Sequence, residues 1–245
     1  MTGKALALTT RDRTLLAEVQ RHSALTRDHL IRLKLFASKT RVNERLKRLT
    51  RAGYLSARRQ PLLSGGPRFV YFPGRLLTEA HARARSQQAW SDLFLNHHLG
   101  IVDIRLAFEA HSTVTRWLSE HDLAGLAVGL IPDAYVEFRQ DGLTYCAFIE
   151  YDRGTETLGR LERKVRSYLE LAFSGRFERT FGRRFFRALL ITDSVGRVAT
   201  MTDAVAHVTD RVVRLTTRAQ IVDHGPLAVI WRRPGQSSLE SLTPS

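Results

Sequence analysis

Apolar residues recur at helical spacing in three short segments at the start of the chain. In the third segment Val42, Leu46 and Leu49 stand at offsets of 0, 4 and 7, which makes one narrow apolar stripe on a helix. Each segment follows a Ser or Thr that can cap a helix N-terminus. The predicted helices cover residues 11–22, 27–35 and 39–52, with N-caps at Thr10, Thr26 and Ser38.

Two short segments with strand-like composition follow, residues 54–59 and 68–72, and a loop rich in Pro, Gly and Ser separates them. We expect two strands joined by a turn. Three short helices followed by such a strand pair are the elements of a winged helix-turn-helix, in which the third helix enters the major groove of DNA.

A strong hairpin signal lies near the middle of the chain, where Asp141-Gly142 separates the apolar segments 134–139 and 143–151. If the pair forms a two-residue turn, the numbers of opposed residues sum to 283. Asp133 then lies directly opposite Glu150, and Asp152 shares their face through the two-residue period of a strand. We therefore expect three carboxylates to converge at one end of the hairpin.

The remaining pattern alternates helices with strands, which predicts an α/β domain around a central mixed sheet. We expect a polar connecting helix at 76–95, a helix at 96–111, a short strand ending near 131, a helix from about 157 to 173, a strand at 188–192, a helix at 198–208, a strand at 227–231 and a disordered tail at 236–245. The α/β domain itself is assigned to residues 96–235.

The distribution of charge adds to this picture. The formal net charge is +14, and counting along residues 1–75 gives 17 Lys and Arg against 4 Asp and Glu. The remainder has 21 against 20, so nearly all of the excess lies in the first third. This asymmetry predicts a separate domain at residues 1–75 that binds a polyanion, with double-stranded DNA as the expected partner.

Basic and polar residues occupy the face of the third predicted helix opposite its apolar stripe. Arg and Asn can pair with base edges, and the other cations can neutralise phosphates. The alternative is a solvated helix face in a domain that binds proteins. The predicted DNA-binding residues are Lys39, Thr40, Arg41, Asn43, Lys47, Arg48 and Arg51 on the helix, and Arg58, Arg59 and Arg68 on the strand pair.

Composition excludes several other classes. No run of 18 apolar residues is present, so we expect a cytoplasmic protein with no membrane partner. We find no Ser/His/Asp constellation, no Gly-rich phosphate loop and no paired-Cys zinc spacing. The single Cys146 is interpreted as a small core residue. His97 and His98 are adjacent on a predicted helix and point about 100° apart, which disfavours a shared metal ion.

The predicted carboxylate cluster has a chemical consequence. Carboxylates this close repel, so they need raised pKa values, a cation or exposure to solvent. Asp133 and Glu150 are the predicted metal ligands, with Asp152 as a third carboxylate. Lys164, the only lysine after Lys47, lies on the flank of a helix from which its long stem can reach the sheet.

Two resemblances follow from these residues. Pro132-Asp133 followed by Glu150-Tyr151-Asp152 resembles the core of the PD-(D/E)xK nucleases, in which a hairpin and its flanking helices surround Mg²⁺. Over residues 8–235 the chain is similar to the replication-relaxation family of plasmids and integrative elements. That likeness rests on the motif from Ile149 to Glu156 and on a following helix that contains Lys164. It implies a role in plasmid replication or DNA relaxation.

The chain departs from the nuclease pattern at one position. The nuclease lysine stands two residues after the second acidic residue, and here that position is Asp152. Lys164 could supply the missing charge from the next helix, as could Arg153 or Arg160. Arginine is a poor base because it stays protonated.

Two main interpretations remain open. In the first, the winged helix binds DNA and a degenerate nuclease-like domain forms a homodimer or recruits replication or transfer proteins. In the second, Asp133 and Glu150 hold Mg²⁺ and, with Asp152 and Lys164, make the protein a DNA endonuclease or nickase. A transcriptional repressor is a further alternative. Relaxase chemistry would require a tyrosine nucleophile and a histidine cluster, and no spacing here singles that out.

Overall fold

The structure is a computed structural model that describes residues 6–61, 66–77, 90–126 and 128–243. The chain divides into two units, Met1–Val102 and Asp103–Ser245. The predicted connecting helix at 76–95 falls largely on residues 78–89, outside the described residues. Residues 92–95 belong to α5, which begins four residues earlier than the pattern indicated. No described helix is long and apolar enough to cross a membrane.

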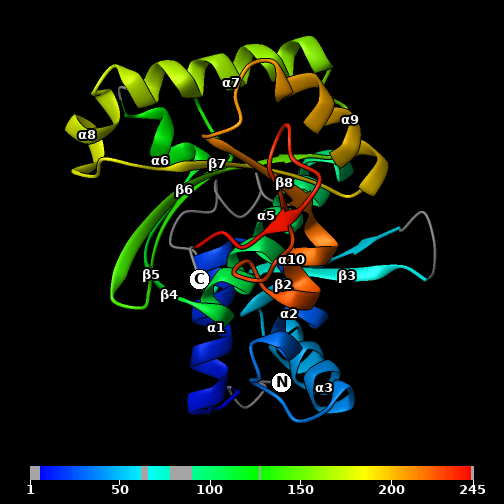
Figure 1. Ribbon diagram of the computed structural model, residues 1–245. Coiled ribbons are helices and arrows are strands. Elements are labelled where there is room, and N and C mark those ends of the chain that lie inside the picture. Colours follow the sequence, from blue (N-terminus) through cyan, green and yellow to red (C-terminus); the bar gives the residue numbers. More distant parts are fainter. Residues whose placement is uncertain (1–5, 62–65, 78–89, 127, 244–245) are drawn as a thin grey trace. The chain divides into compact units, whose positions relative to one another are not determined.

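The first unit combines short helices with a small antiparallel sheet in the order β1-β3-β2 (Figure 1). Its core joins β3 to the start of α5 through Phe72, Leu95 and Leu99. The elements are α1 (Thr10–His22), β1 (Leu25–Thr26), α2 (Arg27–Arg32), α3 (Lys39–Arg51), β2 (Leu55–Gln60), β3 (Arg68–Pro73) and α5 (Asp92–His111), of which α5 continues past the unit boundary.

Side-chain caps set where the helices of the first unit begin. Thr26 and Ser38 cap α2 and α3, as predicted. The prediction of Thr10 as the cap of α1 was wrong by one residue, because Thr9 is the N-cap. Thr9 and Asp12 form a reciprocal capping box, in which the Asp12 carboxylate accepts from the Thr9 backbone N–H at 2.7 Å.

The second unit is built on a mixed seven-stranded sheet in the order β10-β9-β8-β7-β6-β5-β4, which confirms the α/β class. Strands β6, β7 and β8 run parallel, and the other neighbours run antiparallel. The elements are β4 (Thr113–Ser119), α6 (Glu120–Ala124), β5 (Ala134–Gln140), β6 (Leu143–Asp152), α7 (Leu158–Phe173), α8 (Arg176–Phe181), β7 (Arg187–Thr192), α9 (Val195–Ala206), β8 (Val213–Thr217), α10 (Arg218–His224), β9 (Trp231–Arg232) and β10 (Leu239–Glu240).

The central hairpin has the predicted register, with Gln140 opposite Leu143 and Ala134 opposite Ile149. Asp141 and Gly142 have φ values of 50° and 77°, and two consecutive positive values are what a type I′ turn requires. Glycine adopts such a φ without steric cost, and aspartate tolerates it better than most residues do.

Helices cover both faces of the sheet in the second unit, with α7 and α9 over one face and α10 over the other (Figure 1). Under α7 and α9, Tyr135 and Phe148 pack in a large buried cluster with Tyr168. On the opposite face Phe138 of β5 contacts Phe108 near the end of α5. Alternate residues of the central strands therefore serve two cores.

Several strands differ from the sequence prediction. The expected strand ending near 131 is absent from the described residues, and β4 lies earlier as a largely exposed edge strand. The expected strand at 227–231 is β9, at Trp231–Arg232. Strand β8 was missed because it carries Arg214, whose charge is matched by Glu240. Glu240 lies in β10, within the tail that we expected to be disordered.

Candidate functional site

Helix α3 presents a basic face to solvent. Val42, Leu46 and Leu49 are fully buried, which fixes the orientation of the helix. All seven residues of α3 that were predicted to bind DNA are exposed. Within the described residues, the five cations among them make no side-chain hydrogen bond or ion pair. These five cations are Lys39, Arg41, Lys47, Arg48 and Arg51, and we call them the α3 cations.

Arg45 is the basic residue of α3 that the DNA-binding prediction left out, and it has a structural role. Its guanidinium forms a two-point ion pair with Asp12 of α1, whose side chain is 1% exposed. Burial raises the pKa of Asp12, but hydrogen bonds from Arg45 and Thr9 outweigh that effect and leave the pKa lowered. Arg45 thus ties α3 to α1.

The three predicted arginines on β2 and β3 divide into two groups. Arg58 forms an ion pair with Asp92 at 2.5 Å. Arg68 donates to Gln60 at 2.8 Å and to Asn96 at 2.7 Å. Both side chains therefore join the small sheet to the start of α5. Arg59 alternates with Arg58 along β2 and is exposed to solvent.

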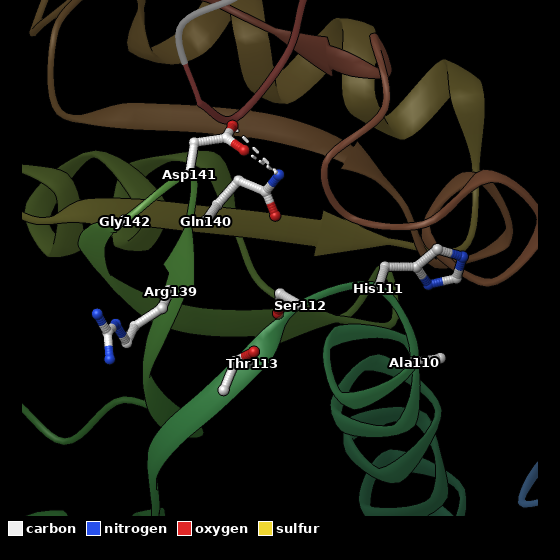
Figure 2. A pocket seen from close by; sticks show the side chains of 8 residues that line it. All are labelled: Ala110, His111, Ser112, Thr113, Arg139, Gln140, Asp141 and Gly142. Atoms are coloured by element: carbon white, nitrogen blue, oxygen red, sulfur yellow. Dashed lines mark hydrogen bonds between the residues drawn. The ribbon is translucent and has the colours of Figure 1, made fainter.

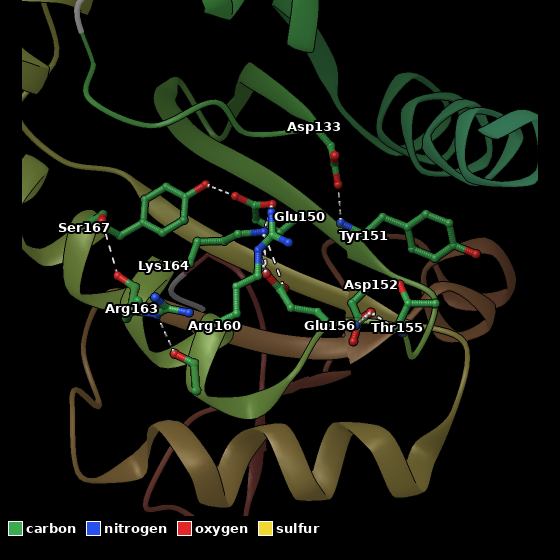
Figure 3. A network of polar contacts seen from close by, with 12 residues as sticks. Asp133, Glu150, Tyr151, Asp152, Thr155, Glu156, Arg160, Arg163, Lys164 and Ser167 are labelled. Carbon is green, nitrogen blue, oxygen red and sulfur yellow. Dashed lines mark hydrogen bonds and ion pairs between the residues drawn. The ribbon is translucent and has the colours of Figure 1, made fainter. Parts of the chain in front are cut away.

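The second unit holds a buried carboxylate network between β6 and α7. The Glu150 side chain is 7% exposed and accepts hydrogen bonds from Lys164 Nζ at 2.9 Å and from the Tyr168 hydroxyl at 2.6 Å. Lys164 also lies 3.3 Å from Glu156, which sequence analysis missed as a member of this group. Figure 3 shows Lys164 reaching from α7 to Glu150, with Glu156 beside it.

Burial dominates the electrostatics of Glu150 and raises its pKa to about 7, even though Lys164 lowers it. The Asp133 carboxylate nearby raises the pKa further, and the Tyr168 hydroxyl lowers it. Asp133 itself accepts a hydrogen bond from the Tyr151 backbone N–H at 2.7 Å. Burial, reinforced by the nearby Asp133 carboxylate, therefore leaves Glu150 with a pKa of about 7.

Asp152 belongs to a different set of contacts. It accepts from Arg197 Nε at 2.9 Å and from the backbone N–H groups of Gly154, Thr155 and Glu156. These bonds hold the turn between β6 and α7. The sequence places Asp152 on the same strand face as Glu150, but β6 ends at this residue and the chain turns there.

The two predicted ligands, Asp133 and Glu150, are a limited donor set for a metal ion. Among the described residues no group of three or more His, Cys, Asp or Glu is arranged to hold one. Mg²⁺ can bind through one or two carboxylates with water and phosphate as its other ligands. Asp133 and Glu150 fit that requirement in number, but both Glu150 oxygens already accept hydrogen bonds.

A second polar network lies at the carboxyl ends of the parallel strands. The Tyr151 hydroxyl donates to Asp193 at 2.8 Å, and Arg218 lies 2.9 Å from Asp193 and 2.6 Å from Asp103. Burial raises the pKa of Tyr151 strongly, and the Asp193 carboxylate adds to that effect while Arg218 opposes it. A buried tyrosine with a raised pKa is a poor nucleophile, so this network does not favour relaxase chemistry.

A surface pocket, shown in Figure 2, is lined by residues that belong to neither network. It has a volume of about 540 Å³. Residues 110–113, at the junction of α5 and β4, line one side, and residues 139–142 of the hairpin turn line the other. The Gln140 side-chain amide donates a hydrogen bond to the Asp141 carboxylate at 3.2 Å.

Comparison with known proteins places the sequence in a family. The sequence model of the family described as replication-relaxation matches residues 16–185, which is more than half of the chain. The chain belongs to the replication-relaxation family. No curated protein is similar enough to be matched. The matched region contains α3, Asp133, Glu150 and Lys164, and it ends just before β7. Membership suggests a role in the replication or relaxation of a mobile element.

Proposed function

We propose that this member of the replication-relaxation family is a DNA-binding protein that uses α3 to bind duplex DNA of a mobile element. The observation that carries the proposal is the exposed set of α3 cations, none of which has a side-chain partner within the described residues. Cations without carboxylate partners are available to neutralise phosphates, and each neutralised phosphate releases counterions.

The order of elements supports this function. Helices α1, α2 and α3 followed by the strand pair β2 and β3 match the order expected of a winged helix-turn-helix, with α3 in the place of the recognition helix. Arg41 and Asn43 lie in the first half of α3, and these residue types can read guanine and adenine edges. The remaining cations would contact phosphates and set the orientation on the duplex.

In this proposal the second unit serves assembly. Its carboxylates have partners within the unit, because Lys164 lies within ion-pair distance of Glu150 and Glu156, and Arg160 lies 3.6 Å from Glu156. These contacts join α7 to β6 without a ligand. The unit would then form a homodimer or recruit replication or transfer proteins.

Binding of the full chain to a duplex from its own element tests the proposal. We expect Arg41→Ala, Asn43→Ala and Lys47→Ala together to abolish specific binding, measured by fluorescence anisotropy, while circular dichroism shows a folded protein. The matched control is Arg163→Ala with Arg166→Ala, which also removes two positive charges, but from exposed positions on α7. Equal loss in both variants would show that net charge, and not α3, determines binding.

A second candidate function is a Mg²⁺-dependent nuclease, and one observation favours it. Lys164 Nζ lies 2.9 Å from Glu150. A lysine from α7 therefore reaches the carboxylate that stands two residues before Asp152, the position at which the nuclease pattern has its lysine. If bound there, Mg²⁺ would activate water and stabilise charge on the phosphate. Cleavage of plasmid DNA that requires both Mg²⁺ and Glu150 would establish this function. Binding without cleavage would support the DNA-binding proposal alone.

A further inference from the structure

The second unit has an apolar pocket of about 360 Å³ on the sheet, close to where β7 begins. Strand register explains why it is hollow. Ala147 of β6 is paired with Arg187 of β7, and Tyr145 is two residues away on the same face of β6. The small side chain of Ala147 leaves a gap between the Tyr145 ring and the Arg187 side chain.

Aromatic side chains form the walls of this pocket. Tyr145 is stacked on Phe138 with ring centroids 5.5 Å apart and an interplanar angle of 20°. Phe185 also lines the pocket and is 80% exposed, so its ring is open to a ligand. Such a wall suits a flat aromatic ligand.

One positive charge at the pocket, that of Arg187, has no counter-ion hydrogen-bonded or ion-paired to it among the described residues. Within the described part of the chain, the Arg187 side chain makes no hydrogen bond or ion pair. The acidic residue whose charge acts on Arg187 is Glu240, which is already paired with the buried Arg214. Burial lowers the pKa of Arg214 most, and the positive charges of Arg187 and Arg233 lower it further by repulsion, although Arg233 is itself paired with Asp210 at 2.8 Å. An anion would relieve this repulsion.

We propose that this pocket binds one nucleotide unit of single-stranded DNA, with its base on Tyr145 and Phe185 and its phosphate on Arg187. Ligand pockets measure roughly 300 to 1,000 Å³, so 360 Å³ suits a small ligand rather than a large one. Base stacking on exposed aromatic rings, combined with cationic groups along the backbone, is how proteins bind single strands.

The pocket is independent of α3, so its test uses the full chain with Arg41→Ala, Asn43→Ala and Lys47→Ala as background. The probe is a fluorescent oligothymidylate, followed by anisotropy. We expect Phe185→Ala to weaken binding about tenfold, as the loss of one stacked base does. The matched control is Phe173→Ala, because Phe173 is 83% exposed but lies outside the pocket. Arg187→Gln should weaken binding and make it less dependent on salt.

Two further probes identify the source of the nucleotide. An abasic oligonucleotide should bind the unchanged pocket as weakly as oligothymidylate binds the Phe185→Ala variant. Thymidine monophosphate should compete only weakly, because it lacks neighbouring phosphates. Strong competition that depends on Phe185 would instead assign the same pocket to free nucleotides. Equal binding of abasic and normal strands, or no effect of Phe185→Ala and Arg187→Gln, would overturn the proposal.

Discussion

Replacement of Glu150 by glutamine tests the buried network of the second unit. The folded protein holds the proton of Glu150 more tightly than the unfolded chain does, because the pKa is about 7 instead of the ordinary 4.5. This contribution to stability is therefore fully present below pH 4.5 and is lost as the pH rises to about 7. At about 1.4 kcal/mol for each pKa unit, the total is roughly 3 kcal/mol.

The assay is urea unfolding followed by tryptophan fluorescence across this pH range, since Trp231 is fully buried in the same unit. The quantity to compare is the difference in unfolding free energy between the wild type and Glu150→Gln. This difference is used because another group also makes the stability depend on pH. Burial lowers the pKa of His98 in the first unit to about 4, so the contribution of His98 to the unfolding free energy rises with pH and cancels when the two proteins are compared.

We expect the wild type to lose roughly 3 kcal/mol relative to Glu150→Gln between pH 4.5 and 7. Glu170→Gln is the matched control, because the Glu170 side chain is on the same helix as Lys164 and is 70% exposed. The same loss in the difference between the wild type and Glu170→Gln would show that the effect is not specific to the buried site. A constant difference for Glu150→Gln would refute the view that burial controls this carboxyl group.

Three other substitutions test single contacts. Arg45→Ala should destabilise the first unit by about 3 kcal/mol in urea unfolding, because it leaves the Asp12 carboxylate buried and unpaired; a loss below 1 kcal/mol would contradict this. Arg197→Ala should likewise destabilise the second unit by about 3 kcal/mol through Asp152, and hydrogen exchange should quicken in the turn after β6. Gly142→Ala should lower the free energy of unfolding by about 1 kcal/mol, because φ is 77° there and alanine is strained at a positive φ. An unchanged Tm would show that the turn accepts alanine without strain.

The sequence predicted best those features whose causes are local. The hairpin register follows from the turn chemistry of Asp141-Gly142, and the buried stripe of α3 follows from the spacing of three apolar residues. The meeting of Asp133 with Glu150 was predictable because the register alone brings them together. The approach of Lys164 was predictable in part, from its place on the flank of α7.

Features assembled from distant segments were not predictable in this way. The Tyr151 network draws on Asp103, Asp193 and Arg218, which lie on separate elements and share no spacing pattern. Strand β8 was missed because a buried arginine interrupts its apolar pattern, and its partner Glu240 is 26 residues away in sequence. Similarly, composition marked Arg58 and Arg68 as DNA contacts, whereas the structure engages both in contacts within the first unit.

The central claim is that α3 binds duplex DNA through its exposed cations. The most direct measurement is the affinity of the full chain for a duplex of its own element across about 50 to 200 mM salt. If the five α3 cations each contact a phosphate, log K should fall with log salt at a slope of about −4 to −5. In the variant with Arg41→Ala, Asn43→Ala and Lys47→Ala, the slope should become less steep by about 2, because two cations are removed. A flat salt dependence, or a slope that this variant leaves unchanged, would contradict the account.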